Sequence, residues 1–422
     1  MSLSRGLAGP PPAHGALRWI AAREGLALWL VAGGAIAAGV AILVQRHVIS
    51  AVHPLFWDIP VYVAAVNAYR LGLDPYVPAV LHSMGAPTSF FLTSPPTVAR
   101  LFRLVAEAGL QPVFRSLLVA LHLLAFLTLP IALGRLFFGR APARLALALG
   151  AMILLFEAAG TEAFSSGNNG TLLYCAIALA ALGGFRQGRW WLFLLAVFVA
   201  TLFKPFYLAF LAVPALAHGV SWRLAVIGTA VGLAAIGVYV LFAVFDQVNF
   251  ANWLARLSEQ TMGEGLVGRN IYGGLRSLVP AAPQTVLILA QLLYIAALAA
   301  AFLLLNPTGR LRWAFLLVAA TFANPRISVY DDSFATIPLA FAAATLLPRA
   351  LPMGVRLAVT VAVLAPLLLV PTYRTVALVP AGLMFPLTSL AILCCASIAQ
   401  RRRGGRGQDE DLQIMSGARA AS

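Results

Sequence analysis

The residues in this sequence with the clearest chemical potential lie beside its apolar segments. Asp58 stands in Phe-Trp-Asp-Ile-Pro, directly after the first apolar segment. A carboxylate in that position can take the proton of an acceptor hydroxyl as the hydroxyl attacks the anomeric carbon of a sugar. Asp58 could instead cap the helix that follows, because Asp is a favourable N-cap and Pro60 suits an early helical position.

The only lysine of the chain, Lys204, is a second candidate. It lies in an apolar stretch directly before Pro205, whereas the other 28 cationic side chains are arginines. Its ammonium could hold a phosphate as a point charge, or the side chain could extend to the membrane surface. Arg326 could clamp the same phosphate with two hydrogen bonds, or it could pair with Asp331 or Asp332 and hold its own loop.

Amides, further acids and aromatic rings in other loops could bind a sugar or an acceptor. These candidates are Trp57, Tyr62, Glu162, Asn168, Asn169, Asn270, Asp331 and Asp332. Simpler interpretations exist for them. The segment 165–170 (SSGNNG) has ordinary turn composition, the aspartate pair could cap a helix or bind a divalent cation, and the rings could belong to the membrane interface. Histidines and cysteines lack zinc-ligand spacing, so no zinc site is expected, and no residue is assigned to a cofactor.

The composition defines what must position these side chains. Of the 422 residues, 61% are hydrophobic and 10% are charged, against roughly 25% charged in an average soluble domain. Such a chain is expected to be an all-α polytopic membrane protein. The net charge of +15 comes from arginines placed between apolar segments, which membrane topology explains better than binding to nucleic acid.

Twelve apolar segments are predicted to span the membrane, namely 26–48, 116–136, 144–161, 170–184, 190–203, 205–217, 223–245, 284–305, 312–323, 333–347, 353–371 and 376–398. Several are shorter than the roughly 20 residues of a straight span. Those around Lys204 and around 324–332 are expected to be broken or tilted helices that line a cavity. Residues 26–398 would form one membrane domain, between a cytoplasmic lead at 1–25 and a basic cytoplasmic tail at 399–422.

Two long loops, 49–115 and 246–283, interrupt these spans. Apolar positions share one helical face in 60–72 and in 95–108, which predicts helices that lie in the membrane interface. Eighteen of the 28 arginines fall on the side that holds both termini, and ten of the 14 acids fall on the other. The positive-inside rule therefore predicts cytoplasmic termini and external loops.

Several short motifs resemble, in order, those of the polyprenol-phosphate-dependent glycosyltransferases of the GT-C class, and most closely glycosyltransferase family 87. They are FWDIPVY at 56–62, GLDPY at 72–76, FFLTSPP at 90–96, SGNNG at 166–170, FKP at 203–205, GRNIYG at 268–273 and the segment from Asn324 to Asp332. The fourth lacks the Gln of the family pattern, and the last lacks its histidine pair. The resemblance covers most of the chain.

This resemblance implies a GT-C-like bundle with Asp58 as the general base. The donor would be a polyprenyl phosphate sugar, with mannose the expected hexose, and the acceptor an extracytoplasmic glycolipid or glycan. Transfer would invert the anomeric carbon. The protein would lie in a bacterial inner membrane, in contact with its lipids. A transporter or flippase of a lipid-linked glycan is the alternative, but inverted repeats and midplane polar groups are not evident. A third possibility is an enzyme-like scaffold without transfer activity.

Overall fold

The computed structural model describes residues 24–49, 55–87, 92–154, 163–262, 270–324, 329–369 and 381–403. Within these ranges the chain forms helices and turns without a strand, and one isolated bridge joins Ala217 to Gly219. Five helices in the described residues are long and apolar enough to cross a membrane. They are α2 (Glu24–Leu43), α6 (Gln111–Phe138), α12 (Trp222–Phe245), α15 (Gln284–Leu305) and α19 (Ala381–Arg402). The expected helical membrane architecture is therefore confirmed.

The other apolar segments also form helices, but shorter ones. These are α7 (Pro142–Leu154), α9 (Asn169–Gln187), α10 (Trp191–Phe203), the 3-10 helix η2 (Pro205–Leu211) with α11 (Ala212–Leu216), α16 (Gly309–Phe322), α17 (Ser333–Ala344) and α18 (Met353–Leu369). Each of the twelve predicted spans thus contains helical residues. Because most of these helices are shorter than about 20 residues, the number of twelve complete crossings stays a prediction. Helix α19 continues past residue 398, where the basic tail was expected to begin.

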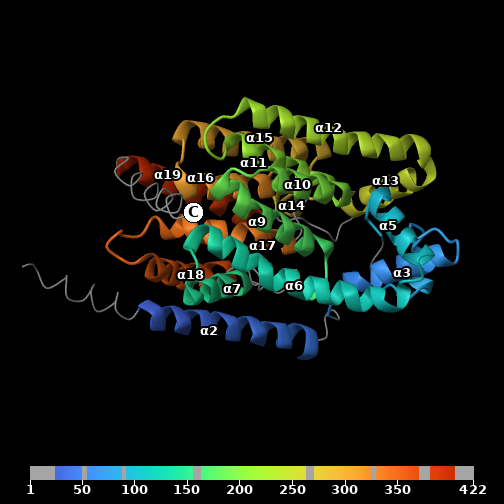
Figure 1. Cartoon of the computed structure of the whole chain (residues 1–422), viewed down its shortest axis with the longest axis horizontal. Helices are drawn as coiled ribbons and strands as arrows, with labels where there is room; N and C mark the ends of the chain where they lie inside the picture. Colours follow the sequence, from blue (N-terminus) through green and yellow to red (C-terminus); the bar gives the residue numbers. More distant parts are fainter. Residues whose placement is uncertain are drawn as a thin grey trace, which may run out of the picture.

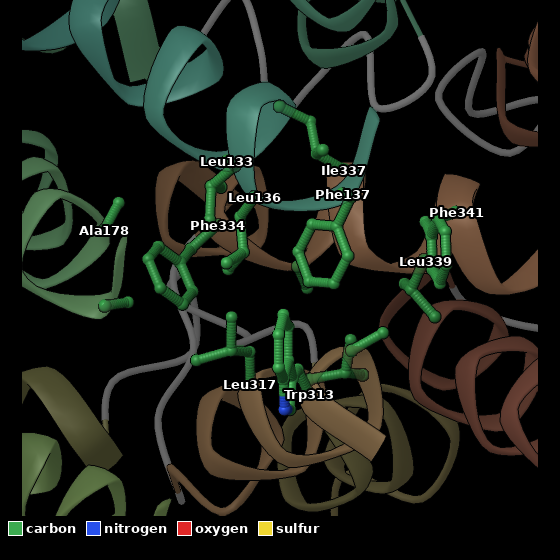
Figure 2. Close-up of a cluster of buried hydrophobic side chains, with 14 of the residues drawn as sticks. Leu133, Leu136, Phe137, Ala178, Trp313, Leu317, Phe334, Ile337, Leu339 and Phe341 are labelled. Carbon is green, nitrogen blue, oxygen red and sulfur yellow. The ribbon is translucent and has the colours of Figure 1, made fainter. Parts of the chain in front are cut away.

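The main core surrounds α17, which is buried along nearly its whole length. This helix packs against α6, α7, α16, α18 and α19. Figure 2 shows Phe334, Ile337 and Phe341 of α17 close to side chains of α6 and α16. Lipid is as apolar as these side chains, so close packing must hold such helices together. The alanines of α17 permit the close approach.

A second, separate core lies in the two long loops. It is built by α3 (Asp58–Arg70), α4 (Pro78–Ser83), α5 (Pro96–Glu107) and α13 (Gln247–Met262), which we call the loop module. Figure 1 shows α3, α5 and α13 together at one end of the bundle. The two predicted amphipathic helices are present, but Val61, Ala65, Val98 and Phe102 are buried in this core. Their apolar faces therefore pack on each other.

Hydrogen bonds join the two loops across a long sequence separation. The Asp74 carboxylate accepts from the backbone N–H of Tyr76 at 2.9 Å and from Asn252 Nδ2 at 2.8 Å. The indole of Trp253 donates to the carbonyl of Thr93 at 3.1 Å. Burial raises the pKa of the Tyr76 hydroxyl, which stays neutral and donates to Ser94 O at 2.7 Å. The loop module is thus one unit.

Arginines bind helix ends at the opposite end of the bundle. The beginning of α2 lies there in Figure 1. The last carbonyls of a helix lack intrahelical partners and carry partial negative charge. Arg312 donates to Leu216 O at 2.6 Å, Arg401 to Leu304 O at 3.0 Å and Arg403 to Thr345 O at 2.7 Å. The arginines at this end of the bundle therefore also stabilise the ends of helices.

Candidate active site

The site arises where short helices end inside the bundle. Helix α6 has 28 residues and α12 has 24, whereas α10 has 13, α16 has 14 and α17 has 12. At about 1.5 Å per residue, the short helices cover about half the depth of the long ones. In Figure 1, α6 and α12 extend to the end of the bundle at which the loop module lies, whereas α9 does not reach that far. Polar residues at the ends of the short helices can therefore meet below the loop module.

Four candidate residues from distant parts of the sequence meet there, and we call them the polar chain. Asn168 Nδ2 donates to Asp58 Oδ2 at 2.5 Å. Lys204 Nζ donates to Asn168 Oδ1 at 2.7 Å and lies 4.0 Å from Asp331 Oδ1. A single amide thus connects a carboxylate to an ammonium that is paired with a second carboxylate.

The side chains of the polar chain differ in their exposure to solvent. The Asp331 side chain is 1% exposed, that of Lys204 is 18% exposed, and Asp58 is half-buried. Charges attract one another more strongly where water is largely excluded, but removing them from water is costly, so the ammonium needs its partners. Asn168 also caps α9 by accepting from Gly170 N at 2.8 Å. The positive end of that helix dipole favours the carboxylates beside it.

The position of Lys204 follows from the proline after it. Pro205 cannot continue α10, and Lys204 takes an extended conformation between α10 and η2. The carbonyls freed at the end of α10 find partners elsewhere. Tyr239 donates its hydroxyl to Thr201 O at 2.7 Å, and the Thr97 hydroxyl of the loop module donates to Leu202 O. The helix end that presents the ammonium is therefore held from two sides.

Asp58 is positioned by the segment that carries Asn168. The backbone N–H of Asp58 donates to Ser166 O at 2.8 Å, and that of Phe56 donates to Ser165 O. Phe56 has φ of 60°, which is uncommon for a residue other than glycine. Asp58 could have capped the helix that follows, but the N-cap of α3 is Trp57 and Asp58 is the first helical residue.

Two glycines permit this close approach, and sequence reasoning did not single them out. Gly167 has φ of +67°, and a Cβ there would lie 2.8 Å from Ile59 Cγ1. A Cβ on Gly170 would lie 3.0 Å from both Asn168 Oδ1 and Lys204 Nζ, and 3.2 Å from Asp331 Oδ1. The polar chain therefore surrounds the space that a side chain at position 170 would need. The sequence signal was the SSGNNG segment itself, in which only the asparagines were chosen.

Other predicted residues lie around or away from the polar chain. Asn169 begins α9 beside Asn168, and Asp332 is fully buried next to Asp331. Trp57 is buried, and Tyr62 packs against Phe102 in the loop module with ring centroids 5.7 Å apart.

Asn270 takes a capping role. It caps α14 (Ile271–Leu278) by accepting from Gly273 N at 2.7 Å, and its amide donates to Asn324 O at 3.3 Å. Glu162 and Arg326 lie outside the described residues, as do 90–91, 268–269 and 325–328 of the matched motifs.

The chemistry available at this site is proton transfer and binding of an anion. Asp58 is a partly exposed carboxylate held by an amide, and Lys204 is a partly exposed cation at hydrogen-bond distance from the same amide. In the described residues, no group of three His, Cys, Asp or Glu side chains is arranged to hold a metal ion. Comparison with known proteins gave no match to a family model, a curated protein or a solved structure.

The packing at Gly170 can be tested with two matched substitutions on α9. Gly170→Ala should lower the thermal midpoint in detergent, because forcing a methyl group into a filled space costs about 1–3 kcal/mol. Gly183→Ala should maintain or raise the midpoint, because its nearest neighbour would be Arg189 O at 3.9 Å and Ala is favoured over Gly in helices. Equal midpoints for the two variants would contradict the close packing of the polar chain around position 170.

Proposed function

We propose that this protein is an integral-membrane glycosyltransferase that transfers a hexose, with mannose the expected sugar, from a polyprenyl phosphate donor to a glycolipid or glycan acceptor. The observation that carries the proposal is the hydrogen-bonded connection of Asp58 to Lys204 through Asn168. Displacement of a polyprenyl phosphate needs a base for the acceptor and a cation for the departing phosphate. Both groups occur here within one polar chain.

The proposed reaction is a single displacement. The acceptor hydroxyl oxygen attacks the anomeric carbon, and its proton passes to the Asp58 carboxylate. The bond from the anomeric carbon to the phosphate oxygen breaks with its electron pair, and the Lys204 ammonium stabilises the charge on that phosphate. The products are the elongated acceptor and polyprenyl phosphate, with inverted configuration at the anomeric carbon.

Asn168 is the proposed positioning residue. Its Nδ2 donates to Asp58 Oδ2 and fixes the direction of the carboxyl group, while its Oδ1 accepts from Lys204. Two groups held by one planar amide keep a constant separation, and a fixed geometry is what makes proton transfer from a bound hydroxyl efficient. Asn169, Glu162, Asp331, Asp332, Trp57, Tyr62, Asn270 and Arg326 stay candidates for contacts with sugar, acceptor or donor phosphate.

The proposed location is a bacterial inner membrane with the loop module on its extracytoplasmic side. One observation supports that sidedness. The helix ends bound by Arg312, Arg401 and Arg403 lie at the end opposite to the loop module, and arginine-rich ends are cytoplasmic by the positive-inside rule. A flippase with the same orientation is the competing function, and the break at Lys204-Pro205 is of the kind found in transporters. A transfer assay with purified protein separates these two functions.

Substitution of Asp58 tests the proposed base. Asp58→Asn retains an oxygen that can accept from Asn168 but cannot take a proton, so turnover should fall by about 10²–10⁴ while the thermal midpoint stays near that of the wild type. Turnover is measured by mass spectrometry of the product formed by purified protein from polyprenyl phosphate mannose and a glycolipid acceptor. Glu107→Gln is the matched control, because it removes an exposed carboxylate from the same loop module.

Two results would contradict the role of Asp58. The first is an Asp58→Asn variant that keeps more than about a tenth of wild-type turnover, which lies above the range expected for loss of a general base. The second is a comparable loss in Glu107→Gln, which would show a general effect of charge in the module. If wild-type protein moves a lipid-linked glycan across the membrane of vesicles and forms no transfer product, the protein is a flippase and the proposed transferase function is wrong.

Substitution of Lys204 tests the proposed phosphate contact. Lys204→Met keeps the aliphatic stem and removes the charge, so the donor KM should rise about 10- to 100-fold, the effect of losing one charge-assisted hydrogen bond. Lys204→Arg should recover only part of this affinity, because the planar guanidinium has a different geometry. The acceptor KM serves as the internal control. Unchanged donor affinity in Lys204→Met would show that Lys204 has a structural role only.

A further inference from the structure

The C-terminal end of α6 collects arginines from several helices. Helix α6 ends at Phe138 and is followed by Gly139 with φ of +89°. Arg310 of α16 donates to Phe137 O at 3.1 Å, and Arg144 of α7 donates to Phe138 O at 3.4 Å. Arg186 of α9 donates to Arg135 O. Together with Arg135 and Arg140, these side chains form what we call the α6 arginine cluster.

The positive charge of this cluster is not balanced by its own loops. The connecting segments 135–144, 184–190 and 306–312 contain no Asp or Glu. Burial lowers the pKa of the Arg186 guanidinium, and Arg310, Arg140 and Arg135 lower it further. Each of the charged groups acting on Arg186 is thus another arginine. Carbonyl oxygens of α6 provide only partial negative charge, so an external anion would stabilise the cluster.

The surface beside the cluster indicates what kind of anion fits. Leu117, Leu121, Leu124 and Ile131 are exposed large apolar side chains on α6. Their spacing of three, four or seven residues places them on one face of the helix. Arg135, which is also exposed, follows Ile131 by four residues and continues that face. An apolar stripe that ends in a cluster of guanidinium groups matches a molecule with a hydrocarbon chain and a phosphate.

We propose that the α6 arginine cluster binds the headgroup of an anionic phospholipid, with an acyl chain along the exposed face of α6. Guanidinium groups bind phosphate oxygens through paired hydrogen bonds. A phosphatidylcholine headgroup carries a trimethylammonium group that the arginines would repel, so lipids with net negative charge are preferred. This site lies at the end opposite to the polar chain and does not depend on the proposed transferase activity.

Native mass spectrometry of the full-length protein with added lipid measures this affinity. The test variant is Arg135→Gln/Arg140→Gln, because both side chains are exposed and the carbonyl contacts of Arg144, Arg186 and Arg310 remain. Each arginine near a lipid surface contributes about fivefold in affinity, so the double variant should bind phosphatidylglycerol about 25-fold more weakly. The control is Arg223→Gln/Arg349→Gln, which removes two other exposed arginines and should bind like the wild type.

The lipid assignment requires three further results. Phosphatidylcholine should bind the wild type at least tenfold more weakly than phosphatidylglycerol. Inorganic phosphate in tenfold excess over lipid should not displace it. The thermal midpoint of the double variant should match that of the wild type without lipid, which shows that it is folded. Equal binding of both lipids, displacement by phosphate, or equal losses in test and control variants would each overturn the proposal.

Discussion

The hydrogen bond from Lys204 to Asn168 is the contact on which the rest of this site depends. An ammonium among apolar helices is stable only with partners, and here the partners are the Asn168 amide and the Asp331 carboxylate. The same amide holds Asp58 and caps α9. One side chain therefore sets the start of a helix, the direction of a carboxylate and the place of a cation. This arrangement is possible because α9 begins and α10 ends inside the bundle.

Two cores fix the geometry around that hydrogen bond. The main core is centred on α17, and the loop module has its own core of aliphatic and aromatic side chains. Phe203, the residue before Lys204, packs against both. The carbonyls of Thr201 and Leu202 accept hydroxyl groups from Tyr239 and Thr97. The cation of the polar chain is thus presented at the joint between the two cores, which is where the proposed function would bring donor and acceptor together.

Much of this fold and part of the site could be predicted from the sequence. Hydropathy predicted where the helices lie, because apolar length is a local property of the chain. The choice of Lys204 rested on its being a single charge beside a proline, and the structure puts it at the centre of the polar chain. Local patterns could not reveal that Asn168 contacts Asp58, since the two residues are 110 positions apart. They also could not reveal that the apolar faces of 60–72 and 95–108 pack on each other, because only tertiary packing decides which surface such a face meets.

The central claim is that Asn168 acts through Asp58, and a double-mutant cycle on turnover tests it most directly. Asn168→Ser keeps a cap for α9 but removes the amide that holds the carboxylate. In the wild-type background this change should lower turnover about 10- to 100-fold, the range that corresponds to a lost hydrogen bond to a charged group. In the Asp58→Asn background it should cause a clearly smaller loss, because residues that act as a unit are not additive and only the contact of Asn168 with Lys204 then remains to be lost. Losses that multiply in the double variant would contradict the account and separate Asn168 from the proton-transfer step.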